Sequence, residues 1–219
     1  AAANQTPCPP GQYQLLTGKT SCFSASPGFQ APSEGSSNQE ECGPGTFSAS
    51  SGQAQCTDAS PGFFVSGSQQ SSEAPCQPGQ YQPDSGQTSC MTVDQGYFTS
   101  DEGTADQIPC EPGTYQPDAG QTSCLAVEPG NYSSTPGSTT QTPCSPGTFS
   151  ADPGQANCTQ AEPGNYVSLD GATSQSPCPP GEYQNVSGSD GCQQAPPGQV
   201  VGLDGSSTPS PCPPGKYQP

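Results

Sequence analysis

Apolar residues in this chain are few and isolated, and they do not follow the period of a helix or of a long strand. The longest apolar runs are Phe63-Phe64-Val65 and pairs such as Leu15-Leu16, far short of the roughly 20 residues that span a bilayer. Instead, a Tyr or Phe stands two residues after most Pro-Gly pairs, and a second Gly usually follows. The pattern therefore predicts many short segments separated by turns, with no membrane insertion.

The Pro-Gly pairs define the local structure that we expect. Pro fixes φ for the second position of a turn, and Gly accepts the positive φ of the third, so each pair predicts a type II turn. The later Gly marks another turn, which indicates a short hairpin or two irregular strands between the turns. The aromatic side chain is the largest apolar group nearby, so we expect it to form the local core.

These turns belong to a tandem repeat. The sequence separations between successive cysteines alternate between 14 and 20, which gives a period of 34, and a weaker period of 17 lies within it. We call each segment of the shorter period, starting at Cys8, Ala25 and so on, a half-unit, and we number its positions from 1; position 4 is Gly in every half-unit. The predicted organisation is the end of a preceding repeat, six complete repeats and the start of a further one: 1–7, 8–41, 42–75, 76–109, 110–143, 144–177, 178–211 and 212–219.

Composition indicates how such repeats are stabilised. Only 27% of residues are hydrophobic, and 29 Pro and 28 Gly leave little for a large core, while 13 regularly placed Cys favour an oxidising, extracellular or cell-surface location. Each unit then needs its neighbours. The expected fold class is small disulfide-rich tandem repeats, forming an elongated rod or solenoid of short β-hairpins and turns with little or no helix.

Charge excludes several partners. The formal net charge of -17 arises from 19 acidic residues against Lys19 and Lys216, so binding to nucleic acid phosphates or to anionic lipid is not expected. No signal peptide precedes Ala1, so the sequence reads as a mature chain or an internal piece.

The cysteines allow two pairings. They occupy positions 1 and 15 of alternate half-units and are lost together from the others, which indicates that they are partners. Disulfides between cysteines 14 residues apart would close one turn-defined unit. Disulfides between cysteines 20 residues apart would also leave no unpaired cysteine within the array. Cys212 lacks a partner because residue 226 lies beyond the sequence. The cysteines predicted to form disulfides are Cys8, Cys22, Cys42, Cys56, Cys76, Cys90, Cys110, Cys124, Cys144, Cys158, Cys178 and Cys192.

Catalytic and metal chemistry has little support in these residues. The absence of His removes the usual proton shuttle and the common triads, and oxidised cysteines offer no thiolate. The acid pairs at 40–41 and 101–102 read as solvated loop residues. The Asp-Gly turns at 169–172 and 203–206 do not follow the spacing of an EF-hand. We expect no catalytic residue, no metal and no cofactor.

Glycosylation is the stronger signal for a modification. Asn-x-Ser/Thr sequences occur at four of the six asparagines, and Ser, Thr and Pro cluster at 133–143 and 205–214, which suits O-linked sugar. Covalently attached glycans would shield a chain with little core. The predicted N-linked sites are Asn4, Asn131, Asn157 and Asn185.

The motif C-x-P-G-x-Y/F followed by G-x-x-x-C resembles the ephrin-receptor-like cysteine-rich repeat over practically the whole chain. The segment 8–22 is also similar to the first module of tumour-necrosis-factor-receptor cysteine-rich domains. The resemblance implies elongated extracellular rods and a bond between positions 1 and 15. This chain keeps that bond only in alternate half-units and lacks the extra receptor cysteines. Long arrays of this type also occur in algal surface proteins, including mastigonemes.

Two functions follow as expectations. The first is a secreted, glycosylated, non-enzymatic structural protein that self-associates into the shaft of an extracellular fibre or surface filament, because no repeat carries an insertion or a distinctive cluster. The alternative is the stalk or ligand-binding ectodomain of a receptor or adhesin.

Overall fold

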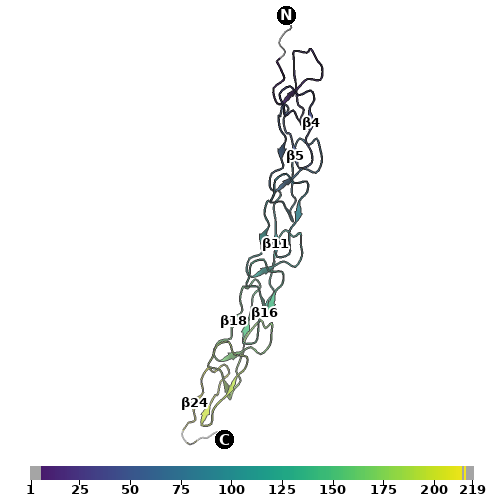
Figure 1. Cartoon of the computed structure of the whole chain (residues 1–219). Helices are drawn as coiled ribbons and strands as arrows, with labels where there is room; N and C mark the ends of the chain where they lie inside the picture. Colours follow the sequence, from purple (N-terminus) through teal and green to yellow (C-terminus); the bar gives the residue numbers. More distant parts are fainter. Residues whose placement is uncertain (1–5, 214, 216–219) are drawn as a thin grey trace. The chain divides into compact units, whose positions relative to one another are not determined.

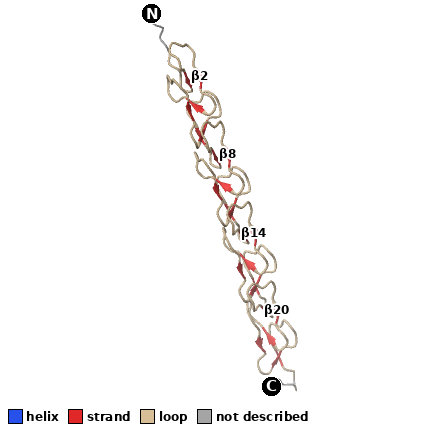
Figure 2. Ribbon diagram, turned by 90° about the vertical axis from the view of Figure 1, so that its right-hand side faces the viewer, coloured by secondary structure: helices blue, strands red, loops and turns tan. Residues whose placement is uncertain are grey.

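The computed structural model describes residues 6–213 and 215, and these residues contain short strands, turns and loops without a helix. Every strand has two residues, and Figure 2 shows the strands in red between longer tan loops. Of the predicted repeat ends 1–7 and 212–219, residues 1–5, 214 and 216–219, with Lys216, lie outside the described residues.

The strands pair in sequence order as two-stranded hairpins, from β1 with β2 to β23 with β24. Their bounds are β1 Gln12–Tyr13, β2 Phe23–Ser24, β3 Phe29–Gln30, β4 Glu40–Glu41, β5 Thr46–Phe47, β6 Thr57–Asp58, β7 Phe63–Phe64, β8 Ala74–Pro75, β9 Gln80–Tyr81, β10 Met91–Thr92, β11 Tyr97–Phe98, β12 Ile108–Pro109, β13 Thr114–Tyr115, β14 Leu125–Ala126, β15 Asn131–Tyr132, β16 Thr142–Pro143, β17 Thr148–Phe149, β18 Thr159–Gln160, β19 Asn165–Tyr166, β20 Ser176–Pro177, β21 Glu182–Tyr183, β22 Gln193–Gln194, β23 Gln199–Val200 and β24 Ser210–Pro211.

The chain divides into two compact units. Unit 1 comprises Ala1–Asp94, Phe98–Ile108 and Ala119–Thr122, and unit 2 comprises Gln95–Tyr97, Pro109–Asp118 and Ser123–Pro219. Unit 1 contains β1 to β10, including β4 and β5 at the purple end of Figure 1, and unit 2 contains β13 to β24. Both units are built from the same half-unit.

Each half-unit opens with the predicted turn. In the first one, the Gln12 amide donates to the Pro9 carbonyl at 3.0 Å, and Gly11 has a φ of 88°. The position-4 glycines of all thirteen half-units have positive φ, between 82° and 89°. The turn leads into the first strand of an antiparallel hairpin, in which Tyr13 lies opposite Phe23. The expected hairpin of each half-unit is confirmed.

Backbone hydrogen bonds join each half-unit to the next at constant spacing. They use the amides and carbonyls of positions 1, 4, 7, 11 and 12, so they do not depend on side-chain identity. Between half-units 59–75 and 76–92 they run from Gly62 N to Gln82 O (2.7 Å), Val65 N to Gln87 O (3.0 Å), Cys76 N to Gly62 O (2.9 Å) and Gly86 N to Ala59 O (2.8 Å). Stacking of neighbouring half-units therefore satisfies backbone groups that two-residue strands leave open.

Position 4 has a second reason to be Gly. A Cβ on Gly62 would overlap the carbonyl oxygen of Gly103, which belongs to position 11 two half-units later. The same overlap would arise at Gly147 with the Gly188 carbonyl. Half-units one full repeat apart thus approach each other backbone to backbone, and any side chain at position 4 would push them apart.

The interior of each unit consists of the side chains of positions 1 and 7, not of aromatic rings. Position 1 is a Cys, Ala or Val that is at most 6% exposed from Cys8 to Cys178, and position 7 is also buried in most half-units. Among the aromatic residues that the structure describes only Tyr81 is buried, at 9% exposed, and the others are half-buried or exposed. The expectation that the rings form the local core is wrong, because positions 1 and 7 fill the space between stacked half-units and leave the rings at its edge.

The predicted fold class is confirmed in its main features. The described residues form small disulfide-rich tandem repeats of short hairpins and turns, and neighbouring half-units stack within each unit.

Candidate functional site

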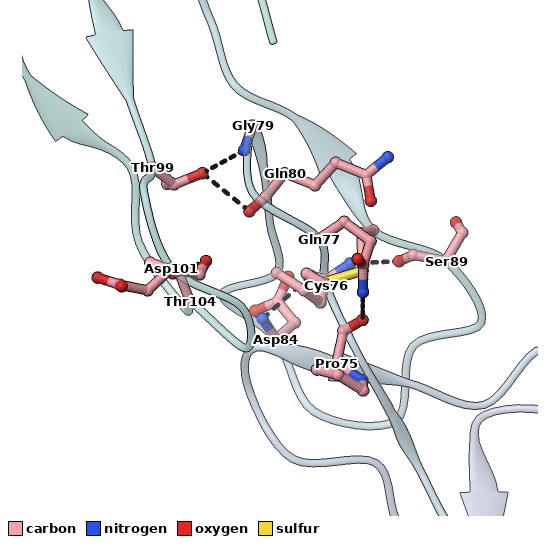
Figure 3. The surroundings of a disulfide bond; sticks show 12 residues. Pro75, Cys76, Gln77, Gly79, Gln80, Asp84, Ser89, Thr99, Asp101 and Thr104 are labelled. Atoms are coloured by element: carbon pink, nitrogen blue, oxygen red, sulfur yellow. Dashed lines mark hydrogen bonds between the residues drawn. A yellow bond between two sulfur atoms is a disulfide. The ribbon is translucent and has the colours of Figure 1, made fainter. Parts of the chain in front are cut away.

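The repeated structural site of this chain is the loop from position 1 to position 15 of each half-unit, which contains the opening turn, the first strand and the connection to the second strand. In cysteine-bearing half-units a disulfide closes it, with Cα atoms 5.7 to 5.8 Å apart. Figure 3 shows the bond of Cys76, whose partner is Cys90. The position-1 cysteine is buried and the position-15 cysteine is half-buried. All six bonds have a sequence separation of 14, so of the two pairings left open the structure contains the first.

A glutamine at position 7, half-buried at Gln14 and buried in the other three cases, crosses four of these disulfide loops. Gln82 donates from Nε2 to the Ser89 carbonyl at 2.8 Å, and its Oε1 accepts from the Asp84 amide at 3.2 Å. Ser89 and Asp84 lie on opposite sides of the loop in Figure 3. Gln14, Gln116 and Gln184 make the same pair of contacts. An amide with both ends bonded adds a polar cross-link to the covalent one.

The cysteine-free half-units close their loops with a hydrogen bond instead. The position-15 side chain accepts from the backbone amide of position 2, as in Gln141 Oε1 with Glu128 N at 2.8 Å. In that pair Gln141 Nε2 also donates to Glu128 Oε2 at 3.1 Å. The other contacts are Ser26 N to Gln39 Oε1 (2.8 Å), Ser60 N to Glu73 Oε2 (2.6 Å), Asp94 N to Gln107 Oε1 (2.8 Å) and Glu162 N to Gln175 Oε1 (2.7 Å).

Sequence reasoning missed this hydrogen-bonded closure. A signal was present, since position 15 is Gln or Glu in five of the six cysteine-free half-units. In the sixth, the corresponding residues are Pro196 and Pro209, which offer neither an amide hydrogen nor a polar side chain. The half-unit that begins at Ala195 therefore lacks both kinds of closure.

The three described glycosylation candidates lie in different surroundings. Asn131 is half-buried in β15, where its Nδ2 donates to the Pro129 carbonyl at 3.4 Å. Asn185 is exposed, and Asn157 lies in the loop beside Cys158. Asn4 lies outside the described residues. The structure does not bring these asparagines together.

The acidic residues are dispersed over the surface. Glu40 and Glu41 are exposed in β4, Asp101 is exposed, and no group of three His, Cys, Asp or Glu suited to a metal occurs in residues 6–213 and 215. Burial raises the pKa of Tyr81 above its ordinary value, and the nearby carboxylates of Asp94 and Asp106 raise it further. A tyrosine that holds its proton more firmly than usual does not supply a general base at neutral pH.

Cys212 is half-buried and forms no disulfide within the described residues. The part of the chain that the structure describes contains no helix long and apolar enough to cross a membrane. Loops closed by disulfides are common in extracellular domains.

Comparisons with known proteins agree with this geometry. Residues 96–144 match the family model described as tyrosine-protein kinase ephrin type A/B receptor-like. No curated protein matches the chain. The cysteine spacing of the matched segment, with its disulfide between Cys110 and Cys124, recurs in both units. The matched segment is therefore similar to an ephrin-receptor-like cysteine-rich repeat, and the same disulfide-closed repeat recurs in both units.

Proposed function

We propose that this chain is a glycosylated, non-enzymatic segment of the shaft of an extracellular fibre or surface filament, of the kind found in mastigonemes. Ephrin-receptor-like repeats with regular disulfides are typical of extracellular structural or receptor-like domains. One observation carries the finer proposal: within each unit, every half-unit is joined to the next by the same backbone hydrogen bonds. Such a connection can be repeated without limit and bears load along the chain direction.

The shaft would need contacts between chains. The exposed hairpin strands carry apolar residues at position 16, including Phe23, Met91 and Leu125, each about half exposed. Position 16 is Phe, Met or Leu in three of the six complete cysteine-bearing half-units and Thr or Gln in the other three, so these apolar groups can meet the same groups of another chain. We therefore propose lateral self-association through several weak contacts that act together.

Electron microscopy of the native material tests this function. The expected result is bundled filaments in which neighbouring chains contact each other through the exposed hairpin strands. Triple substitution of Phe23, Met91 and Leu125 by Ser should reduce bundling and leave the disulfides formed. Isolated single chains in the native material would contradict the proposal.

A matched control comes from exposed hydroxyl residues at position 13 of three cysteine-free half-units. These are Ser37, Ser71 and Thr173. Their triple substitution by Ala changes as many surface side chains without touching position 16, so bundling should be unchanged.

A receptor or adhesin stalk is the second candidate, favoured by the receptor-like family that residues 96–144 match. A stalk holds a ligand-binding domain away from the surface and does not need partners of its own kind. Monomeric behaviour of the secreted chain, together with tight binding of a protein ligand, would support this candidate over the filament.

N-linked glycans are part of the proposed function. The exposed side chain of Asn185 leaves room for a sugar in the folded chain, whereas Asn131 would have to turn away from the Pro129 carbonyl. We place glycans at the four predicted asparagines, with greater occupancy at Asn185 than at Asn131. Intact mass before and after deglycosylation counts them, and an unchanged mass would remove glycans from the proposal.

A further inference from the structure

One loop of unit 2 lines a surface cavity of unusual composition. Residues 132–142, which run from β15 to β16, border about 340 Å³ that is open to solvent. Eight of the nine lining residues carry a hydroxyl group, and the ninth is Gly137. None of them is charged. The cavity is therefore rich in hydrogen-bond donors and acceptors, and it has no feature that would select an ion.

The buried wall of this cavity contains an unsatisfied hydroxyl. Ser133 is 4% exposed and lines the cavity, and its Oγ is the one buried side-chain oxygen or nitrogen in residues 6–213 and 215 without a hydrogen-bond partner. A buried hydroxyl without a partner is unfavourable and rare in folded proteins. The site thus lacks a group that could bond to Ser133.

Equivalent hydroxyls elsewhere in the chain are satisfied. Thr99, at the same position 7, accepts from the Gly79 amide at 3.0 Å and donates to the Gln80 carbonyl at 3.2 Å, and Figure 3 shows both bonds. Ser48 and Ser150 donate to the carbonyl two residues later, at 3.3 and 3.2 Å. The fold itself therefore does not forbid a partner at position 7.

Local competition explains why Ser133 is different. The carbonyl two residues after it belongs to Thr135, and it accepts instead from the Ser138 hydroxyl at 2.6 Å. In four cysteine-bearing half-units a glutamine at position 7, such as Gln116, reaches across the loop to the opposite backbone. The Ser133 side chain is too short to make that bridge.

We propose that this cavity binds a neutral polyhydroxylated ligand, namely a sugar residue of a glycan. The surrounding Ser and Thr side chains can pair with the hydroxyls of a sugar, and one sugar hydroxyl can donate to and accept from the covered Ser133 Oγ when the loop side chains above it turn aside. The half-buried ring of Tyr132 offers an apolar face for the C–H groups of the sugar. The volume lies at the lower end of the range for small-ligand sites, which suits one or two sugar rings.

This inference does not depend on the filament function, since a stalk could carry the same site. In a glycosylated assembly, the sugar would come from a glycan of a neighbouring chain. Ordered water is the competing occupant, because water also satisfies buried hydroxyls in polar cavities. The experiment has to separate the two.

The test uses the full chain and free glucose, galactose and N-acetylglucosamine, followed by amide chemical shifts. We expect saturable shifts confined to residues 132–142. Ser133→Gln, which copies the residue found at Gln116 and fills the loop, should abolish them, and Ser133→Ala should weaken binding about tenfold. Ser150→Ala is the matched control and should leave binding unchanged.

Two results would overturn the proposal. Saturable shifts with none of the three sugars would mean that the cavity holds water only. Shifts that persist in Ser133→Gln would place binding elsewhere. Amide protection of the neighbouring half-units, measured on each variant, distinguishes loss of the site from loss of folding.

Discussion

Close stacking of half-units one full repeat apart can be tested with two alanine substitutions. Gly147 and Gly154 occupy positions 4 and 11 of one half-unit in unit 2, with φ of 86° and 76°. Their amides donate to Val167 O and Val127 O at 2.7 and 2.9 Å. The space around an added methyl group differs: a Cβ on Gly147 would overlap the Gly188 carbonyl oxygen, whereas a Cβ on Gly154 would meet no atom within 4 Å.

The difference sets the expected magnitudes. An L residue held at positive φ costs about 1–2 kcal/mol, and both variants incur this. Gly147→Ala also inserts a methyl group against a backbone carbonyl that cannot rotate away, and overpacking of this kind costs about 1–3 kcal/mol more. We expect a local destabilisation of about 1–2 kcal/mol for Gly154→Ala and about 2–5 kcal/mol for Gly147→Ala.

Hydrogen exchange on the disulfide-intact chain measures these local opening energies. In Gly147→Ala, protection should fall at the amides of Ala161 and Gly188, which connect the neighbouring half-units. Equal losses in the two variants would show that only the turn conformation requires Gly, and would refute the role assigned to the close approach.

Three further predictions concern the loops and one buried tyrosine. Gln141→Ala removes the bond to the Glu128 amide and should destabilise its half-unit by about 1 kcal/mol, seen as faster exchange of that amide. Replacing Cys76 and Cys90 by Ala should destabilise the local repeat by about 2–4 kcal/mol, measured by the same exchange experiment. Because the pKa of Tyr81 is raised in the folded state, its contribution to stability is complete below the ordinary tyrosine pKa and is lost as the pH rises through the folded pKa. Tyr81→Phe should therefore make the free energy of unfolding fall less steeply with rising pH, measured in a series of alkaline unfolding experiments.

Each of these predictions has a control. Thr140→Ala, next to Gln141 and exposed, should leave the Glu128 amide unchanged. Reduction of the remaining disulfides should add to the effect of the double Cys variant; if the double variant alone unfolds nothing, the disulfide is dispensable. For Tyr81→Phe the control is neutral pH, well below the ordinary tyrosine pKa, where the difference in stability between the two chains should not change with pH; a difference that changes there as much as at alkaline pH would show that Tyr81 is not its source.

Much of the architecture could be read from local chemistry. Turn positions depend on the φ preferences of Pro and Gly alone, so the turn at Gly11 and its repeats were predictable residue by residue. The joint presence or absence of cysteines identified the partners, although spacing alone left two pairings open. The candidate hydroxyl cavity could not be predicted, because it depends on which carbonyl Ser138 occupies.

The sequence by itself determined the repeat, its turns, the lack of helix-forming segments and the dependence of each half-unit on its neighbours, because these follow from the periodic placement of Pro, Gly and Cys. Tertiary structure alone decided what fills the interior. Positions 1 and 7 fill the space between stacked half-units, so Cys, Ala and Val at position 1 are buried while rings such as Tyr115 remain half-buried. It also decided that Gln141 replaces a disulfide, because only folding brings its side chain to the Glu128 amide.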